Sequence, residues 1–467
     1  MTHFDAIIIG AGSAGYNAAR ILGAHGKSVA MVDKGPLGGL CILRGCMPTK
    51  TMLRTTDVLQ LIRETSELGI EVEGVRADFQ AIMARQHRLV KGFQAYRVEG
   101  IRKAPNARLI QGSARFSGPD RIEVDGVTYT ADRFLVSTGS TPSVPAVPGL
   151  AEAGYITSDE AMDLTRLPAS LIVWGGGVIA LELGQFYARL GVKVTMIVRG
   201  EHVLSREDLD VQEVVEAAIA ADGITLLRGV KPLSVERRDG LKAMTLAQGD
   251  RTMVLEAEEI LVATGRTPLI APLDLAAAGV EAPNGLIRVD ARMRTSNPAI
   301  FAAGDCLGDF FLVHVAIQQA EVAAHNMLDK SPARTADYRL LASAIYTDPN
   351  VARVGLSEKD AAAEGREVLV GKYAFEDLGK AECMGKGAMQ GFVKLLADPA
   401  TGEILGAAIV GPEGADLIHE LIVAMEFRCT VERLMQIPHL HPTLAEIITY
   451  PAEEIAEERA RRGLALG

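Results

Sequence analysis

The 467-residue sequence has little of several features that mark common protein classes. Its five cysteines are odd in number and mostly far apart, which argues against the disulfide framework of a small secreted domain. No basic cluster is long enough to follow a phosphate backbone, and 48 basic against 59 acidic residues give a net charge of −11, so nucleic acid is not an expected partner. No run of ~20 residues is apolar without charges or glycines, so we expect no transmembrane helix.

The N-terminus lacks the basic region of a secretory signal peptide, and the short apolar run that follows breaks at Gly10. Together with the few cysteines, this predicts a cytoplasmic protein. The composition, 48% hydrophobic and 23% charged, is typical of a compact soluble chain. At ~100–200 residues per domain, the length predicts two to four domains. Glycine is abundant, with 47 residues against 20 prolines, and many of the glycines are clustered.

Two segments of the sequence share one βαβ plan, in which a buried strand leads through a glycine turn into a helix and a second strand. Two such units in one chain predict two dinucleotide-binding domains. Two similar segments, FLVSTGSTP and ILVATGRTP, each place a strand before Thr-Gly. The predicted strand, helix and strand cover residues 5–9, 13–25 and 27–32 in the first unit, and residues 170–174, 178–190 and 193–198 in the second.

The first glycine turn fits the G-x-G-x-x-G fingerprint of a dinucleotide site. Gly10 permits the sharp turn, Gly12 lets a pyrophosphate approach the backbone, and Gly15 lets helix and strand pack closely. The phosphate charge would then face the unpaired N–H groups at the start of the helix. Asp33 ends the following strand, where its carboxylate can accept hydrogen bonds from ribose hydroxyls.

The second glycine turn, Gly175-Gly176-Gly177, differs at the end of the following strand. An acid at that position would hold the 2′-hydroxyl of NAD, but this chain has Val198-Arg199 instead. A guanidinium suits a 2′-phosphate, and Arg206 is close enough in sequence to assist, so we favour NADPH. The alternative is that Arg199 is an exposed cation at a strand end.

Two cysteines, Cys41 and Cys46, lie five residues apart just after the first unit. Such a spacing can close a small disulfide ring, and a helix N-terminus nearby would stabilise a thiolate. Pro48 suits the first turn of a helix, which would carry Lys50 one turn after Cys46. On spacing alone, two buried structural thiols or half a metal site remain alternatives. The other cysteines offer no recognisable set of metal ligands, so we expect no metal site.

The chain from about residue 346 alternates strand patterns and then continues into helices from about residue 415, without a further nucleotide turn. This pattern predicts an α+β module. Residues 452–462 pair Glu with Arg at helical spacing, which predicts a solvated helix face.

The segment GGLCILRGCMPTK resembles the GGxCxxxGCxPxK motif of the class I pyridine nucleotide–disulfide oxidoreductases. This family includes dihydrolipoamide dehydrogenase, glutathione reductase and mercuric reductase. The two glycine turns, the Thr-Gly segments, TSNPAIFAAGDC and HPTLAE extend the resemblance over essentially the whole chain.

The resemblance implies an α/β fold with two Rossmann-like dinucleotide-binding domains and a C-terminal α+β dimerisation domain. Residues 1–149 and 272–340 would form a discontinuous FAD-binding domain. Residues 150–271 would form the NAD(P)-binding domain, and residues 341–467 the dimerisation domain of a homodimer.

The resemblance also assigns cofactor residues. Asp305 would bond the ribityl chain of FAD, residues 311–314 would lie near the isoalloxazine ring, and the backbone of Ala114 would meet the adenine. The full FAD set is Gly10, Gly12, Ser13, Ala14, Gly15, Asp33, Lys50, Ala114, Thr138, Gly139, Gly304, Asp305, Phe311, Leu312, Val313 and His314. The NAD(P) set is Gly175, Gly176, Gly177, Val178, Ile179, Glu182, Val198, Arg199, Arg206 and Gly265.

The catalytic roles implied by the resemblance involve three pairs. Cys46 would face the flavin as the charge-transfer thiol, and Cys41 would be the interchange thiol that attacks the substrate. Lys50 and Glu182 would pair beside the flavin N5. A thiol also needs a group that removes and returns its proton, which suits a histidine.

His441 would be that base, oriented by Glu446, and in the family it reaches the partner subunit's cysteine pair. His439 is interpreted as a structural neighbour, with half a metal site as the alternative for the two histidines. Arg20 and Arg44 would suit an anionic disulfide, with surface cations as the alternative reading of each.

These features favour an NADPH-dependent FAD flavoprotein that reduces a small disulfide, or a related electron acceptor, through Cys41 and Cys46. The alternative is an NAD-linked dihydrolipoamide dehydrogenase, which Val178 and His314 favour. A flavin-bound redox sensor without turnover is a more remote third possibility.

Overall fold

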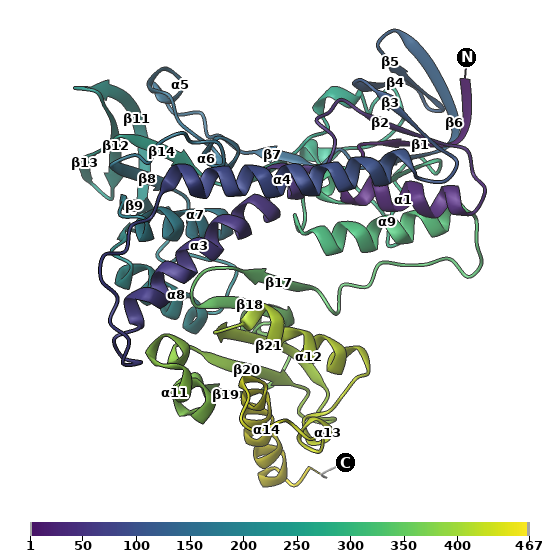
Figure 1. The fold of residues 1–467 in the computed structure, drawn as a ribbon. Coiled ribbons are helices and arrows are strands. Elements are labelled where there is room, and N and C mark those ends of the chain that lie inside the picture. Colours follow the sequence, from purple (N-terminus) through teal and green to yellow (C-terminus); the bar gives the residue numbers. More distant parts are fainter. Residues whose placement is uncertain (1, 465–467) are drawn as a thin grey trace. The chain divides into compact units, whose positions relative to one another are not determined.

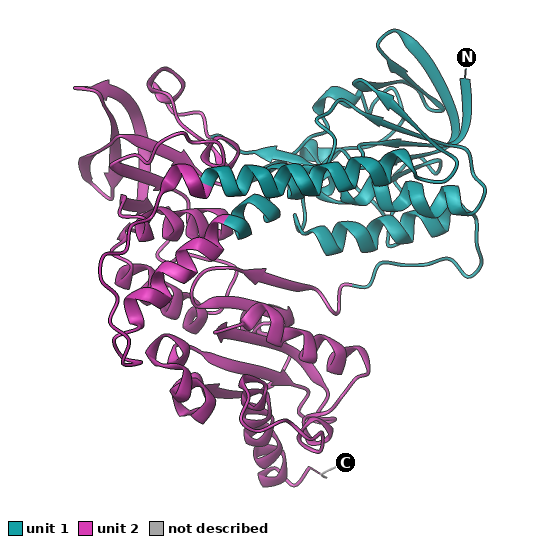
Figure 2. Cartoon of the chain, in the orientation of Figure 1, with its two compact units in different colours: residues 1–51, 83–144, 265–337 teal, residues 52–82, 145–264, 338–467 magenta. Residues whose placement is uncertain are grey.

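The computed structural model describes residues 2–464 (Figure 1). The chain divides into two compact units (Figure 2). Unit 1 comprises Met1–Thr51, Met83–Val144 and Gly265–Asp337, and unit 2 comprises Met52–Ile82, Pro145–Thr264 and Tyr338–Gly467. The first glycine turn thus lies in unit 1, whereas the second lies in unit 2 with the C-terminal module. The division into three domains at the boundaries given above stays a prediction.

Unit 1 is built on a seven-stranded sheet with the order β3-β2-β1-β6-β5-β4, in which β16 pairs with β6. Strands β1, β2, β3, β6 and β16 run parallel, whereas β4 and β5 form antiparallel pairs. The bounds are β1 (Thr2–Ile9), β2 (Val29–Asp33), β3 (Ala107–Gln111), β4 (Ala114–Gly118), β5 (Arg121–Val124), β6 (Val127–Val136) and β16 (Ile300–Ala302).

The centre of this sheet is covered on both sides, which the sequence of β1 reflects. Its last four residues, AIII, are all buried, as is typical of a parallel strand between two layers. Helix α1 (Ser13–Ala24) packs its small buried residues against α9 (Val313–Met327), and the two helices lie side by side in Figure 1. The predicted strand–helix–strand unit is confirmed.

Further elements of unit 1 surround its functional positions. The short strands β7 (Ser140–Pro142) and β15 (Arg266–Pro268) follow the two Thr-Gly segments and pair with each other in antiparallel fashion. Helices α3 and α4 contribute residues to both units. The remaining bounds are α2 (Leu40–Arg44), α3 (Cys46–Glu64), α4 (Phe79–Arg102), η1 (Ala271–Leu273), η2 (Pro283–Gly285) and η3 (Asp305–Leu307).

Unit 2 contains the second βαβ unit, which is also confirmed. A parallel sheet has the order β10-β9-β8-β14, and a separate antiparallel sheet has the order β11-β12-β13. The bounds are β8 (Ser170–Trp174), β9 (Lys193–Ile197), β10 (Thr225–Leu227), β11 (Val230–Arg238), β12 (Leu241–Gln248), β13 (Arg251–Ala257), β14 (Glu259–Val262), α5 (Leu150–Ala153), α6 (Ser158–Ala161), α7 (Val178–Arg189) and α8 (Leu209–Ala221).

The C-terminal module of unit 2 is a five-stranded antiparallel sheet with the order β17-β18-β21-β20-β19. Its α+β character was expected, but β19 was not assigned from the sequence. The bounds are β17 (Ala342–Ile345), β18 (Asn350–Gly355), β19 (Leu369–Ala374), β20 (Phe392–Ala397), β21 (Ile404–Gly411), α10 (Glu358–Ala363), α11 (Gly379–Met384), α12 (Gly414–Glu426), α13 (Val431–Met435), α14 (Thr449–Arg461), η4 (Phe375–Asp377), η5 (Lys386–Met389) and η6 (Leu444–Ile448).

Helix α14 corrects part of the prediction for residues 452–462. Glu458 pairs with Arg461 and Arg462 on the exposed side, as expected. Arg459, however, is buried and bonds the equally buried Glu432 at 2.6 Å, because the opposite face of α14 packs against the module. Within the described residues, no helix is long and apolar enough to cross a membrane.

Candidate active site

The first glycine turn is fixed by close backbone contacts in unit 1. Gly10 has a φ of +103°, and a Cβ there would lie 2.3 Å from the carbonyl oxygen of Ser137. A Cβ on Gly15 would lie 1.9 Å from the oxygen of Gly10. By contrast, a Cβ on Gly12 would meet only the Cα of Gly39, at 3.9 Å. The turn is therefore tightly packed against the sheet on one side and open beside Gly12, as a phosphate cradle requires.

Asp33 lies at the end of β2, beside this turn. Its Oδ2 accepts a hydrogen bond from the N–H of Ala11 at 2.7 Å, and its Oδ1 accepts one from Gly35 at 2.7 Å. The carboxylate is thus held in place by the backbone, and its remaining lone pairs can still accept hydrogen bonds from ribose hydroxyls.

The Thr-Gly segment after β6 provides a second sign of a ligand. The hydroxyl of Thr138 is buried and has no hydrogen-bond partner among the described residues. A buried hydroxyl without a hydrogen-bond partner lowers the stability of the fold unless a bound molecule supplies the partner. Gly139 follows with a φ of +76° and no atom within 4 Å of a Cβ position. Unit 1 therefore has both an open glycine cradle and an unsatisfied buried hydroxyl, and these features fit FAD.

Asp305 belongs to a polar network that the sequence did not reveal. Ser140 donates to Asp305 at 2.7 Å, and Arg266 donates to Ser140 at 2.8 Å. The signal was present, since Ser140 and Arg266 follow the two Thr-Gly dipeptides at the same offsets. Gly304 is also fixed, because its N–H donates to Gln319 at 2.8 Å.

The remaining positions of the predicted FAD set also lie in unit 1. Ala114 begins β4 and is buried. Phe311 has a φ of +55°, a backbone conformation that is uncommon for a large side chain. Leu312 caps α9, and Val313 and His314 form its first turn. The N-terminus of α9 is therefore preceded by a strained residue. Ser13 and Ala14 open α1.

The cysteine pair lies where two short helical segments meet. Cys41 is in α2, and Cys46 is the first residue of α3, so the N-terminus of α3 can stabilise a thiolate. A Cβ on Gly39, just before α2, would lie 2.9 Å from the Cα of Gly12. The segment that leads into the pair therefore lies directly against the first glycine turn.

The two cysteines are thiols linked by a hydrogen bond. This bond is the main cause of a raised pKa for the Cys41 thiol, and burial raises that pKa further. The charge of Arg97, on α4, acts in the opposite direction. Pro48 lies in the first turn of α3, as predicted, and Lys50 follows it.

The other three cysteines differ in their burial. Cys306 is completely buried, and burial raises its pKa to about 12. Cys383 is exposed on α11, and Cys429 is half-buried in the C-terminal module. Burial also raises the pKa of Cys429.

The second glycine turn, in unit 2, repeats the geometry of the first. Gly175 has a φ of +140°, and a Cβ there would lie 2.3 Å from the carbonyl oxygen of Ala263. A Cβ on Gly177 would meet no atom within 4 Å, so this turn is also open at one position. Val178 and Ile179 follow as the first residues of α7.

Arg199 and Arg206 lie on a loop that packs against this turn. Leu204, within the loop, donates its N–H to the oxygen of Gly176 at 2.8 Å, and a Cβ on Gly176 would lie 2.7 Å from Cγ1 of Val198. Both arginines are exposed, and neither makes an ion pair or hydrogen bond within residues 2–464. Their guanidinium groups are therefore available to a ligand.

Two predicted contacts join residues of different units and stay predictions. Lys50 belongs to unit 1 and Glu182 to unit 2, where Glu182 is buried and accepts a hydrogen bond from the N–H of Tyr346 at 3.0 Å. Gly265, from the predicted NAD(P) set, lies in unit 1.

His441 and Glu446 form the pair expected of a general base and its orienting carboxylate. Nδ1 of His441 lies 2.8 Å from Glu446, whose other oxygen accepts the N–H of Thr443 at 2.8 Å. The hydrogen bond from Thr443 is the main cause of a lowered pKa for Glu446, and the one with His441 lowers this pKa further. Because Nδ1 faces the carboxylate, Nε2 is left to exchange protons, and the side chain is 82% exposed.

His439 also bonds a glutamate but differs from His441 in its burial and in the partners of its two ring nitrogens. Its Nε2 lies 2.6 Å from Glu420, its Nδ1 lies 2.8 Å from the oxygen of Ile437, and only 10% of its side chain is exposed. With both nitrogens engaged, His439 is a structural residue, as expected, and cannot act as a second base.

A cluster of three carboxylates has the geometry of a cation site but is filled by a lysine. Asp208, Asp210 and Glu358 lie within 4.8 Å of one another. Nζ of the buried Lys394 lies 2.8, 2.9 and 2.7 Å from them. Burial lowers the pKa of Lys394, but the three carboxylates outweigh this effect and raise it. The ammonium group therefore occupies the position that a metal ion would take among these carboxylates.

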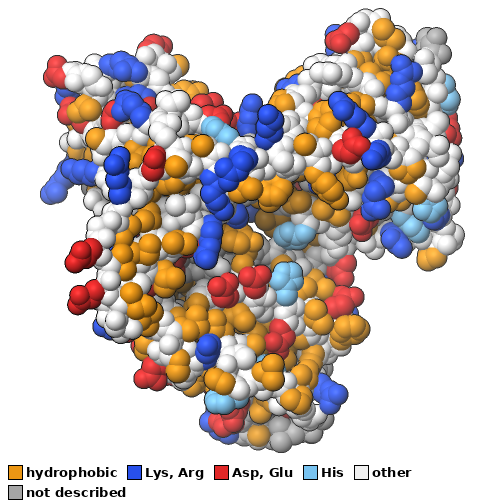
Figure 3. Space-filling model, viewed as in Figure 1, with side chains coloured by type: hydrophobic (Ala, Val, Ile, Leu, Met, Phe, Trp, Pro, Cys, Tyr) orange, Lys and Arg blue, Asp and Glu red, His pale blue; other side chains and the backbone are white. Residues whose placement is uncertain are grey.

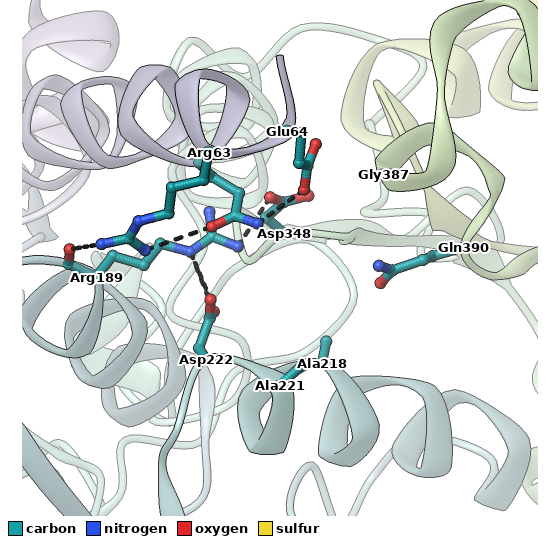
Figure 4. A pocket seen from close by; sticks show the side chains of 10 residues that line it. Arg63, Glu64, Arg189, Ala218, Ala221, Asp222, Asp348, Gly387 and Gln390 are labelled. Carbon is teal, nitrogen blue, oxygen red and sulfur yellow. Dashed lines mark hydrogen bonds and ion pairs between the residues drawn. The ribbon is translucent and has the colours of Figure 1, made fainter. Parts of the chain in front are cut away.

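A cavity of about 240 Å³ in unit 2 was not expected from the sequence (Figure 4). Its wall includes Arg189, whose guanidinium bonds Asp222 at 3.0 Å and Asp348 at 2.9 Å. Arg63 donates to the carbonyl oxygen of Arg189 at 2.7 Å. The charged groups of this cavity thus satisfy one another, and we assign it a structural role.

These features can be compared with known proteins. Residues 4–320 match the family described as pyridine nucleotide-disulphide oxidoreductase, and residues 341–452 match the dimerisation domain of that family. The chain belongs to the pyridine nucleotide-disulphide oxidoreductases. Both the predicted family and the predicted α/β fold class are confirmed.

Relatives of two kinds resemble this family member over nearly its whole length. Dihydrolipoyl dehydrogenase of Chlorobaculum parvum is 37% identical over 453 residues, with 95% of each chain covered. Mercuric reductase of Lysinibacillus sphaericus is 32% identical over 446 residues, covering 95% of this chain and 81% of the relative.

A solved structure, the HOCl-induced flavoprotein disulfide reductase RclA from Escherichia coli, has a TM-score of 0.84. It is 24% identical and covers 95% of this chain and 98% of its own, and this likeness shows the fold alone. The family is FAD-dependent and uses a pyridine nucleotide. The chain is accordingly a flavoprotein oxidoreductase that acts on sulfur groups.

Proposed function

We propose that this oxidoreductase uses NADPH to reduce a small disulfide through Cys41 and Cys46. The hydrogen-bonded cysteine pair at the N-terminus of α3 carries the proposal, because the segment before it contacts the first glycine turn. The glycine turn, Asp33, Thr138 and Asp305 would hold FAD. When bound, FAD accepts hydride from the nicotinamide nucleotide and passes two electrons to the cysteine disulfide.

The dithiol then reduces the substrate in two exchanges. The thiolate of Cys41 attacks one sulfur of the substrate disulfide and forms a mixed disulfide, and the other substrate sulfur leaves as a thiolate. Cys46 next attacks the Cys41 sulfur, which releases the second substrate thiolate and closes the Cys41–Cys46 disulfide. Two electrons and two protons are thus transferred to one disulfide.

His441 would supply the protons. With Nδ1 fixed by Glu446, its Nε2 can take the proton of the interchange thiol on the partner subunit and return it to the departing substrate thiolate. The exposed side chain suits a role at a subunit interface, where it would reach the partner subunit's cysteine pair. We therefore propose a homodimer.

The surface of the C-terminal module supports this assembly. Phe427 and Leu440 are each 80% exposed, and Val423 is 56% exposed. In Figure 3, hydrophobic side chains are exposed among charged ones on the module, in the lower part of the view. Sedimentation analysis should give the mass of two chains, and a monomer with full activity would contradict the homodimer.

The preference for NADPH rests on Arg199 and Arg206, which are exposed beside the second turn and are suited to a 2′-phosphate. Steady-state reduction of a disulfide panel with NADPH and with NADH tests this point. A clear preference for NADH would contradict it, and failure of both nucleotides to reduce the flavin anaerobically would contradict the enzyme as proposed.

A second candidate is an NAD-linked dihydrolipoamide dehydrogenase. The 37% identity to dihydrolipoyl dehydrogenase over 95% of both chains favours it. Rapid oxidation of dihydrolipoamide with NAD, and slow reduction of disulfides with NADPH, would select this candidate.

A further inference from the structure

Helix α4 brings a cation to the cysteine pair that the sequence did not single out. Arg97 lies on this helix, and its charge acts on Cys41. One turn earlier, Gln94 donates a hydrogen bond to the oxygen of Leu37 at 2.9 Å, and a Cβ on Gly38 would lie 3.5 Å from Cγ of Gln94. This face of α4 therefore packs on the segment that leads into Cys41.

The guanidinium of Arg97 is held in place by an aromatic ring, but one of its nitrogens has no hydrogen-bond acceptor among the described residues. It lies over the ring of Tyr16 on α1, 4.6 Å from the ring centroid. Its Nη1 is buried and makes no hydrogen bond among the described residues. A buried donor without an acceptor is costly, and a guanidinium is best completed by a carboxylate or phosphate. No acidic side chain forms an ion pair with Arg97 in the described part of the chain.

We propose that Arg97 is a specificity-determining residue that binds an anionic group of the substrate beside Cys41. The substrate would then be a disulfide that bears a carboxylate or another acidic group close to its sulfur atoms. In a chain of net charge −11, such an anion needs a local cation. This inference rests on the proposed role of Cys41 as the thiol that meets the substrate.

The test compares two alkylating agents that differ in charge. Holoenzyme is reduced with dithiothreitol, desalted, and treated with iodoacetate or iodoacetamide, and modification of Cys41 is followed by mass spectrometry. We expect Arg97→Met to slow the reaction with iodoacetate about tenfold while the reaction with neutral iodoacetamide changes little. Arg97→Lys, which keeps the charge, should give an intermediate ratio. Arg102→Met, an exposed arginine of the same helix, is the matched control.

Equal slowing of both reagents would mean that Arg97 acts only on the reactivity of the thiol and would overturn the proposal, as would no change in either rate. Loss of FAD from Arg97→Lys would assign the guanidinium to the cofactor and would also overturn it. The wild-type enzyme gives an independent check, because rising salt should lower the iodoacetate rate relative to iodoacetamide.

Turnover then separates this inference from the proposed function. With NADPH or NADH, Arg97→Met should raise the KM for dithiodiglycolate, whose carboxylates lie one carbon from the sulfur atoms, about tenfold and leave that for the neutral dithiodiglycolamide nearly unchanged. A wild-type enzyme that reduces no disulfide with either nucleotide would contradict the proposed function, whereas the alkylation ratio would still decide the role of Arg97.

Discussion

The two glycine turns share one backbone plan but differ in the side chain that follows the second strand. In both, a Cβ on the first glycine would lie 2.3 Å from a carbonyl oxygen, that of Ser137 in unit 1 and of Ala263 in unit 2. Asp33 then ends β2 with its carboxylate fixed by two backbone N–H groups, whereas Arg199 follows β9 without a partner among the described residues. The two turns therefore share their backbone geometry, and the side chain after the second strand is the difference on which the proposed nucleotide preference rests.

The largest effects are expected from substitutions that distort each glycine turn separately, since these test whether the two turns bind different cofactors. Gly10→Ala and Gly175→Ala each place a Cβ against a backbone oxygen and impose a positive φ, a strain of about 1–3 kcal/mol before any clash is relieved. We expect Gly10→Ala to be purified without flavin. Gly175→Ala should keep its flavin colour but no longer be reduced by NADPH. If both variants lost FAD equally, the two turns would not have separate cofactors.

A charge reversal at Arg199 tests the side chain instead of the backbone. In Arg199→Glu, a carboxylate would repel the 2′-phosphate and could hold a free 2′-hydroxyl. The KM for NADPH should rise about 100-fold, because a charge-assisted contact is lost and a repulsion is added. The KM for NADH should fall or stay unchanged. An equal change for both nucleotides would show that Arg199 does not contact the 2′-phosphate.

The corresponding substitution in unit 1, at Asp33, should have a smaller effect on cofactor binding. Asp33→Asn keeps one acceptor oxygen but replaces the other with a donor, which opposes one of the two backbone N–H groups. We expect FAD to bind about tenfold more weakly, measured by flavin fluorescence after dilution. The ratio of the KM values for NADPH and NADH should not move, and a shift in that ratio would contradict the separation of the two sites.

The smallest effect should come from Asp57, on α3 and outside both turns. Burial, with the nearby charge of Asp348, raises its pKa to about 6. Ionised Asp57 therefore destabilises the fold, and this cost appears as the pH rises from about 4 through 6. Asp57→Asn should raise the free energy of unfolding at pH 8 and not at pH 4, as measured by denaturant titration. The gain should be less than about 1 kcal/mol because the side chain is 43% exposed. Neither KM should change.

Short local patterns in the sequence predicted the two βαβ units and singled out most of the candidate site residues. The glycine turns, the strands that flank them, the cysteine pair and His441 with Glu446 all lie within short segments whose spacing reflects their geometry. What could not be predicted depends on contacts between distant segments. The charge of Arg97 acts on Cys41 because α4 packs on the segment that leads into this cysteine. Asp305 accepts a hydrogen bond from Ser140, 165 residues away in the sequence. The helical charge pattern predicts an exposed Arg459, but its buried position facing Glu432 depends on tertiary packing.

Lys394 has a consequence for protein engineering. It lies on β20 of the C-terminal module, yet two of its three carboxylates, Asp208 and Asp210, come from the start of α8 in the second nucleotide-binding segment. Removing one partner of a buried ion cluster typically costs about 3–5 kcal/mol. A chimera that imports a nucleotide-binding segment from a relative would therefore leave Lys394 buried without two of its partners unless the imported segment also supplies both aspartates. The two segments should therefore be exchanged together.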